Sequence, residues 1–214
     1  PGPDLETPLF SAHDLAVFRG ERCLIQSLSL EVAAGDIVHL VGPNGCGKTS
    51  LMRVFAGLAT PERGDVQWRG APIHRCLTEF HQNLAWLGHA AGLKGDLTLE
   101  ENIRFDNALR RRAAPQRVSE VLQRLGLANR RDVAARGLSA GQRRRLALAR
   151  VLLSDAALWL LDEPFTNLDD SGQNLVSELF RDHAAAGGAI VFAAHSAVDI
   201  EGRTVRRLAW QGHG

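Results

Sequence analysis

The chain has 214 residues, of which 45% are hydrophobic and 23% are charged, a composition typical of a globular protein with one well-filled core. Its formal net charge of +1 gives no reason to expect nucleic acid or another polyanion as a partner. Three scattered cysteines without a Cys-x-x-Cys pair predict neither a disulfide framework nor a zinc site, and the longest apolar runs fall far short of the roughly 20 residues of a membrane-spanning helix.

The N-terminal part of the chain alternates short strands with Gly-rich turns. Its first residues, PGPDLETP, show no basic region followed by an apolar stretch, so we expect no export signal and a reducing, cytosolic setting. The segments LFSAHDLAVF and CLIQSLSLEV are predicted strands around the turn RGER. DIVHLVG is a short buried strand that leads directly into a helix in PNGCGKTSLMRVFAGL, and GDVQWRG and NLAWLG are two further short strands.

The C-terminal half has longer helical patterns. From Leu99 to about Leu127 the pattern is helical, in LEENIRFDNALRRR and, after Pro115, in QRVSEVLQRLGL. Residues 139–153 and 170–186 are predicted helices, and ALWLLDEP and GAIVFAAH are predicted buried strands. Because no long linker or repeat interrupts this alternation, we predict a single α/β domain over residues 1–214, with a helical insert at about 99–136.

Residues 42–49, GPNGCGKT, carry the strongest chemical signal. They match the spacing G-x-x-x-x-G-K-[ST] between an apolar strand and a helix, the context in which this spacing forms a phosphate-binding loop. The glycines allow backbone N–H groups to converge on phosphate oxygens, Lys48 adds a charge for the β- and γ-phosphates, and Thr49 adds a hydroxyl for Mg²⁺. The alternative, a turn that only starts a helix, is disfavoured because strand, spacing and helix agree. Cys46 is interpreted as a small filler of the loop rather than a reactive thiol.

Two adjacent acids follow the buried strand of LWLLDEP. Asp162, at its end, is a candidate Mg²⁺ ligand, and Glu163 is a candidate for orienting or deprotonating the attacking water. Solvated loop acids are the alternative, and the four apolar residues before them argue against it. His195 follows the next predicted strand, which places it at the same sheet edge, where ligands of open α/β sheets bind.

In order and spacing, these motifs together with LSAGQ (138–142) and NLD (167–169) resemble the ATP-binding cassette (ABC) family over nearly the whole chain. The resemblance implies a P-loop NTPase fold with an antiparallel β subdomain and a helical insert. It implies ATP and Mg²⁺ as ligands, catalytic roles for Lys48, Glu163 and His195, and metal contacts from Thr49, Asp162 and His89. The nucleotide-binding positions that it implies are Gly42, Pro43, Asn44, Gly45, Cys46, Gly47, Lys48, Thr49, Ser50, Phe18, Ser139, Gly141, Gln142 and Asp169.

The signature segment LSAGQ, continued by a helix to residue 153, is the most specific single element of the resemblance. In that family this turn does not serve its own phosphate loop but caps the γ-phosphate of ATP held by a second cassette packed head to tail. Ser139, the backbone N–H of Gly141 and the helix start are therefore expected to form a half-site, and the protein is expected to act as a dimer. The arginines 143–145 that follow are assigned mostly to solvent and to pairing on the helix surface.

Two positions depart from the common pattern of the family. Cassettes usually stack an aromatic side chain, often Tyr, on adenine, and this chain has no Tyr, so Phe18 is the candidate with Arg19 as its competitor. A Gln that normally joins the Mg²⁺ site to the membrane partner is replaced by His89, or by Ala90 if the loop shifts. His89 is suited to a water-mediated role, since Mg²⁺ prefers oxygen ligands.

The segment FHQNLAWLGHAAGLKGDLTLEENIRF, with LSAGQRRRLALARVLL and LWLLDEPFTNLD, resembles the cytochrome c maturation branch of the family, the haem-exporter-type cassettes. This resemblance implies a peripheral subunit on the cytoplasmic face of a bacterial inner membrane. The implied partners are the membrane subunits CcmB, CcmC and CcmD, with hydrolysis coupled to haem export or to release of the haem-loaded chaperone CcmE. The alternative is an exporter of another cargo. His74 and His81 are interpreted as surface or partly packed residues rather than haem ligands.

The sequence argues against two further classes of ABC protein. A chromosome or repair ATPase would need a long coiled coil between Lys48 and Asp162, and the interval is too short for one. A translation-factor cassette protein would need two cassettes, and this chain contains one set of motifs.

Overall fold

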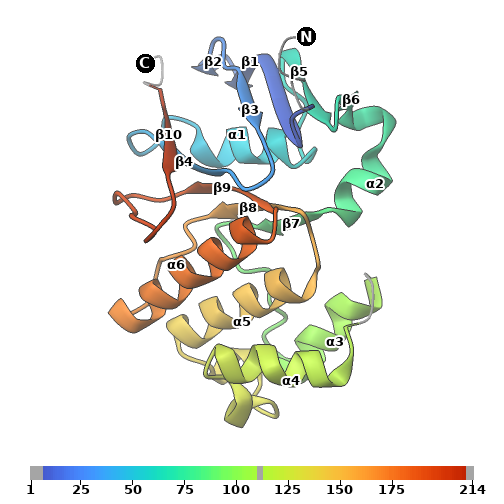
Figure 1. The fold of residues 1–214 in the computed structure, drawn as a ribbon, viewed down its shortest axis with the longest axis vertical. Helices are drawn as coiled ribbons and strands as arrows, with labels where there is room; N and C mark the ends of the chain where they lie inside the picture. The colour runs from blue at the N-terminus through green and yellow to red at the C-terminus, as the bar shows by residue number, and fades with distance from the viewer. Residues whose placement is uncertain (1–6, 110–112, 211–214) are drawn as a thin grey trace.

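The computed structural model describes residues 7–109 and 113–210, which form a small antiparallel sheet, a parallel sheet and helices on both sides of the latter (Figure 1). The strands are β1 (Phe10–Arg19), β2 (Arg22–Ile25), β3 (Leu30–Val32), β4 (Ile37–Val41), β5 (Arg63–Trp68), β6 (Ala71–Pro72), β7 (Leu84–Leu87), β8 (Leu158–Asp162), β9 (Ala189–Ala193) and β10 (Val205–Ala209). The α-helices are α1 (Lys48–Phe55), α2 (Leu77–Gln82), α3 (Leu99–Leu109), α4 (Pro115–Arg124), α5 (Ala140–Leu153) and α6 (Asp170–Ala185), with 3-10 turns at Ile73–Arg75, Ala128–Arg130 and Ala135–Gly137. The expected absence of an export signal at the start of the chain, and residues 110–112 of the predicted helix, lie outside the described residues.

The parallel sheet has the strand order β10-β4-β9-β8-β7. Its inner strands are apolar along nearly their whole length because helices cover both faces of such a sheet. Side chains alternate between the two faces with the period of a strand: Ile190 and Phe192 of β9 enter one hydrophobic core, whereas Val191 and Ala193 enter the other.

Helix α1 fills the space between the parallel sheet and the antiparallel sheet, while α5 and α6 cover the opposite face (Figure 1). Helices α3 and α4, from the predicted insert, pack on α5 and share its hydrophobic core. The predicted α/β core, with an antiparallel sheet beside a parallel one, is confirmed. The assignment of residues 99–136 as a subdomain stays a prediction.

The prediction of one continuous strand in CLIQSLSLEV was wrong. The segment forms two strands, β2 and β3, which pair with different halves of β1. Between them, side chains replace part of the ladder: Ser27 donates from its hydroxyl to the Asp14 carboxylate, and the Asp14 N–H donates to the Ser29 hydroxyl oxygen. Serine and aspartate side chains compete with sheet hydrogen bonds in this way, which interrupts the strand.

The sequence pattern also missed β10, β6 and α2. Strand β10 lies at the sheet edge beside β4, and its arginines Arg206 and Arg207 are exposed, so it lacks the apolar run of an inner strand. The other two elements are too short for a clear periodicity.

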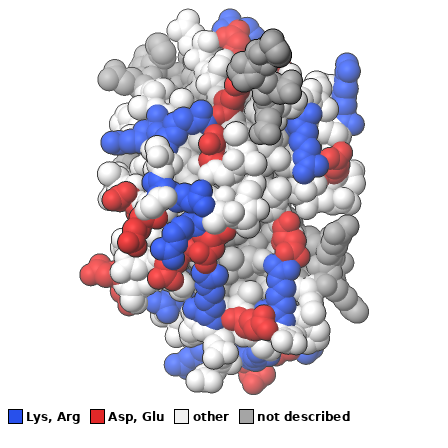
Figure 2. Space-filling view, in the orientation of Figure 1, with Lys and Arg blue, Asp and Glu red and all other residues white. Residues whose placement is uncertain are grey.

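Basic and acidic side chains are interspersed on the molecular face shown in Figure 2. Ion pairs join separate segments of the chain, such as Arg117 with Asp155 and Arg124 with Asp182. Within residues 7–109 and 113–210, no helix combines the length and apolar character that a membrane span requires.

Candidate functional site

The phosphate-loop segment 42–47 connects the end of β4 to the start of α1. Its conformation requires glycine: Gly45 and Gly47 have φ of 77° and 102°, in the left-handed region. A Cβ on Gly47 would lie 2.9 Å from the Cβ of Leu24, and one on Gly42 would lie 2.5 Å from the Cys46 sulfur. Cys46 is 3% exposed, which agrees with its interpretation as a filler of the loop.

Lys48 and Thr49 begin α1. The Lys48 side chain faces the inside of the loop, and the Thr49 side chain faces the end of β8. The Lys48 ammonium donates to the carbonyl oxygens of Gly42 at 2.7 Å and Pro43 at 3.1 Å. The Thr49 hydroxyl donates to Oδ2 of Asp162 at 2.8 Å. This last bond joins two segments more than a hundred residues apart in the sequence, so the tertiary structure assembles the phosphate loop and the acidic strand end into one site.

Asp162 and Glu163 are both buried, at 2% and 8% exposed. The backbone of Glu163 has a φ of 56°, a left-handed conformation that is costly for a residue with a side chain. Its N–H donates to the Ala193 carbonyl at 2.9 Å, and its carboxylate lies 3.4 Å from Nε2 of the exposed His195. The structure therefore brings Glu163 and His195 together at the carboxyl edge of the parallel sheet, as their positions after β8 and β9 predicted.

The signature turn is a well-formed helix start. Ser139 caps α5: its hydroxyl accepts from the Gln142 N–H at 3.1 Å, and the Gln142 side chain accepts from the Ser139 N–H at 2.9 Å. A Cβ on Gly141 would lie 2.8 Å from the Asn167 carbonyl oxygen, so only glycine allows this close approach. Among the described residues, no hydrogen bond joins the exposed Ser139 to the phosphate loop, which leaves the turn open toward solvent.

The assignment of Arg144 to solvent was wrong. Its side chain is 6% exposed and donates to the main-chain carbonyl oxygens of Asp162, Glu163 and Pro164. Arg145 forms the kind of surface pair that was expected, with its guanidinium 3.1 Å from Oδ1 of Asp169, the N-cap of α6. A signal for Arg144 existed in the sequence: it shares the helix face of the buried residues Ala147, Leu148 and Val151, at spacings of three, four and seven.

The candidate adenine-stacking residue Phe18 is 45% exposed at the end of β1. The partner strand β2 contributes Leu24, which contacts Gly47, so the hairpin of Phe18 and Arg19 stands beside the phosphate loop. A second neighbour of the loop was not predicted: the Trp210 indole donates to the Cys46 carbonyl at 3.1 Å. Trp210 follows β10, the strand that sequence patterning missed.

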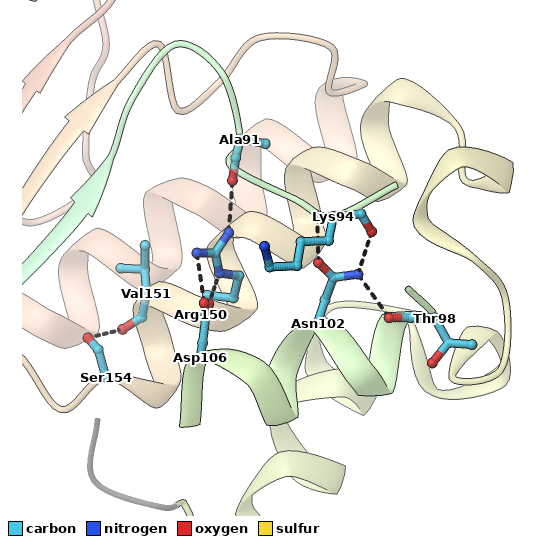
Figure 3. A network of polar contacts seen from close by, with 8 residues as sticks. All are labelled: Ala91, Lys94, Thr98, Asn102, Asp106, Arg150, Val151 and Ser154. Atoms are coloured by element: carbon cyan, nitrogen blue, oxygen red, sulfur yellow. Dashed lines mark hydrogen bonds and ion pairs between the residues drawn. The ribbon is translucent and has the colours of Figure 1, made fainter. Parts of the chain in front are cut away.

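His89 lies exposed in the bend after β7. Within the described residues it forms no hydrogen bond or ion pair with Thr49 or Asp162, and no three His, Cys, Asp or Glu residues are grouped as a metal site there. The loop that follows His89 is held firmly (Figure 3). Arg150 of α5 pairs with Asp106 of α3 and donates to the Ala91 carbonyl at 2.9 Å.

Asn102 holds the other end of this loop (Figure 3). It is 3% exposed; its amide oxygen accepts from the Lys94 N–H, and its amide nitrogen donates to the carbonyls of Lys94, Leu97 and Thr98. Neither anchor was predicted, because both depend on which side chains meet across elements.

The family model described as ABC transporter matches residues 25–166, which include the phosphate loop, the signature turn and the acidic strand end. The chain belongs to the ABC transporter family. As a member of this family it binds and hydrolyses ATP.

The curated relatives are similar over nearly their full length. The cytochrome c biogenesis ATP-binding export protein CcmA of Methylococcus capsulatus is 46% identical over 192 residues, which are 89% of this chain and 93% of that protein. The protein of the same name from Salmonella typhi is 43% identical over 206 residues, which are 96% of this chain and 98% of that protein.

Solved structures support the fold alone, because their identities are low. An ATP-binding subunit of an ABC transporter superposes with a TM-score of 0.81 at 24% identity, covering 87% of this chain and 79% of that one. An ABC transporter ATP-binding protein of Pyrococcus furiosus gives 0.80 at 19% identity, covering 94% and 96% of the two chains.

Proposed function

We propose that this chain is the ATP-hydrolysing subunit of a bacterial inner-membrane complex for cytochrome c biogenesis, coupling hydrolysis to haem export or to release of the haem-loaded chaperone CcmE. The hydrogen bond between Thr49 and Asp162, with Glu163 and His195 beside it, carries the assignment of the site. The cytochrome c part rests on the names of relatives that are 43–46% identical over most of the chain.

The backbone of residues 42–47 and Ser50 hold the nucleoside triphosphate. The Lys48 side chain moves from its carbonyl partners to the β- and γ-phosphates. The Thr49 hydroxyl and the Asp162 carboxylate would hold the Mg²⁺ that accompanies ATP, because they already lie 2.8 Å apart and offer the oxygen ligands that Mg²⁺ prefers. Bound there, Mg²⁺ neutralises phosphate charge.

Glu163 acts as the general base for the attacking water, and His195, 3.4 Å from its carboxylate, orients the reacting groups. Support for these roles comes from the position of both residues at the carboxyl edge of the sheet, where ligands of open α/β sheets bind, and from the burial of Glu163. The carboxylate therefore approaches the γ-phosphate from a fixed backbone.

The other half of each site comes from a second copy of the chain. Ser139, the N–H of Gly141 and Gln142 cap the γ-phosphate across the dimer interface, and Asp169 approaches the same interface. Support comes from the signature turn, which in the described part of the chain is hydrogen-bonded within itself and not to its own phosphate loop. Phe18, beside the loop, stacks on adenine, with Arg19 as the alternative.

The complex is placed on the cytoplasmic face of the inner membrane, with CcmB, CcmC and CcmD as membrane subunits. His89 contributes to coupling between the nucleotide site and the membrane subunits. It would contact Mg²⁺ through water, and its loop, which is anchored to α3 and α5, would contact those subunits. An exporter of another cargo is the alternative function.

The test is a bacterial strain that lacks the gene for this chain, complemented with the parental gene or with Glu163→Gln. We expect covalent haem in c-type cytochromes to be lost in the deletion strain, restored by the parental gene and not restored by the variant. Affinity purification from membranes should recover CcmB, CcmC and CcmD. Normal c-type cytochromes in the deletion strain, with different membrane subunits bound, would favour the other cargo.

A further inference from the structure

Arg144 is a buried cation whose position the ATPase mechanism above does not use. It lies in the second turn of α5, five residues after Ser139, and is 6% exposed. Burial lowers the pKa of its guanidinium, and the nearby carboxylates of Asp162 and Glu163 oppose this effect. Arginine keeps its charge in proteins, so a full positive charge stays directly behind the two acids.

The contacts of Arg144 are made to backbone, not to the carboxylates themselves. Nη2 donates to the carbonyls of Asp162 and Glu163, and Nε lies 3.4 Å from the Pro164 carbonyl oxygen. The planar guanidinium is suited to several acceptors at once. This arrangement leaves the Glu163 carboxylate free to face His195 while its main chain is fixed.

The backbone of Glu163 needs such support because its φ of 56° is left-handed. Conformations of this kind cost of order 1–3 kcal/mol and persist where the surroundings hold them. The Glu163 carbonyl also accepts from the Thr166 N–H at 3.1 Å, and the Glu163 N–H is bonded to Ala193. Arg144 is the contact that comes from α5, the helix that starts at the signature turn.

We propose that Arg144 is a positioning residue: it holds the backbone of Glu163 in the conformation that presents the carboxylate for catalysis, and thereby links the base of one site to the helix that caps the other. This inference rests on the proposed function, in which Glu163 is the base and Ser139 serves a second copy. It requires that loss of Arg144 impairs hydrolysis without impairing nucleotide binding or dimer closure.

The test is the variant Arg144→Met, which keeps an unbranched apolar stem but removes all the donors. We expect kcat to fall at least about tenfold, since displacement of a reacting group by about 1 Å can cost 10²-fold. ATP binding to the monomer should stay within about twofold of parental, because the phosphate loop is untouched. An ATP-bound dimer should accumulate in size-exclusion chromatography with Mg²⁺ and ATP.

A double-mutant cycle with Glu163→Gln separates this role from general support of the fold. If Arg144 acts through Glu163, adding Arg144→Met to Glu163→Gln should not lower the residual rate further. Arg144→Lys, which keeps the charge but not the fork, should recover part of the rate and guards against misfolding of the Met variant. Arg181→Met, an arginine replacement at a half-exposed position on α6, is the matched control.

Three results would overturn the inference: a parental kcat in Arg144→Met, loss of ATP-driven dimerisation in that variant, or losses that multiply independently in the double variant. The second would mean that Arg144 only supports the signature helix. The proposed function fails separately, if Glu163→Gln alone hydrolyses ATP at the parental rate.

Discussion

At the scale of single residues, the site combines two acids of different environment at one strand end. Asp162 already accepts a hydrogen bond from Thr49, whereas the Glu163 carboxylate faces His195 and Thr166. A carboxylate that is engaged by a metal-binding hydroxyl suits charge neutralisation. One held beside a histidine at the sheet edge suits proton transfer.

Glu163→Gln keeps the size and reach of the side chain but removes its basicity. General-base help is worth about 10² to 10⁴ in rate, so hydrolysis should nearly stop while ATP binding persists. Closure without hydrolysis leaves nothing to reopen the dimer, and the variant should accumulate as an ATP-bound dimer in chromatography. Lys48→Ala is the contrasting control, since it should weaken binding itself. A parental rate in Glu163→Gln would contradict the assignment of the base.

The buried His183 leads us to expect that the free energy of unfolding depends on pH. Burial lowers its pKa to about 4, although the carbonyls of Ala157 and Ala189 favour the charged form, and its ring stacks on Trp159 at 3.9 Å between centroids. The unfolded chain has a normal pKa near 6.5 and binds the proton more readily. Between about pH 6.5 and 4 the unfolded chain therefore binds a proton that the folded chain does not. The free energy of unfolding keeps its full value above about pH 6.5 and falls by at most about 3 kcal/mol as the pH drops toward 4.

Urea unfolding at pH 7.5 and pH 5.0 tests this. His183→Phe keeps an aromatic ring for Trp159 and removes the titration, so its free energy of unfolding should change less between the two pH values than that of the parent. His74→Phe, at an exposed position, should keep the parental change. Equal pH dependence in all three proteins would show that His183 does not contribute.

At the scale of elements, α5 serves several purposes along its length. Its start is capped by Ser139, its second turn holds the acidic strand end through Arg144, and its later turns hold the loop after β7 through Arg150. The helix therefore connects the signature turn, the candidate base and the loop that carries His89. A substitution at its N-terminus has two separable effects, one on the stability of the helix and one on the contact with ATP held by the second copy.

Ser139→Asp separates these effects. Aspartate is as good an N-cap as serine, so thermal stability should be unchanged or slightly higher. Its negative charge, however, would meet the γ-phosphate of the second copy, so ATP-driven dimerisation and hydrolysis should be lost while monomer ATP binding remains. Ser139→Ala, which removes the cap acceptor, should cost about 1 kcal/mol of stability. Full activity in Ser139→Asp would limit Ser139 to a capping role.

At the scale of the whole molecule, each chain carries two half-sites, and a second copy packed head to tail would complete both. The isolated chain should be mostly monomeric and a poor ATPase, with a rate per chain that rises with protein concentration as dimers form. Sedimentation with and without ATP, at several concentrations, measures both properties. A stable nucleotide-free dimer with full activity would contradict the shared site.

Coupling to the membrane partner is also a property of the assembly. His89→Ala should lower partner-stimulated hydrolysis more than basal hydrolysis, because His89 lies in an exposed bend between β7 and the anchored loop. Comparing both rates with and without the membrane subunits measures the difference, and His74→Ala serves as the control. Equal loss of both rates would instead indicate a directly catalytic His89.

Much of this protein was determined by local sequence. The phosphate loop, the longer helices and inner strands, and the two acids at the end of β8 follow from glycine placement and from apolar runs of fixed period, which depend only on neighbours along the chain. For the same reason the helix predicted from residue 139 begins there, since Ser139 and Gln142, which cap it, lie within one turn.

Only the tertiary structure decided which distant groups meet. The break between β2 and β3, the pairing of the Arg-rich β10 with β4, and the burial of Arg144 against the backbone of Glu163 each depend on surfaces that come together across the fold. From sequence alone a charged side chain is predicted to be exposed, because burying its charge costs free energy. It becomes buried where folding supplies enough acceptors, and those carbonyls belong to residues about twenty positions away.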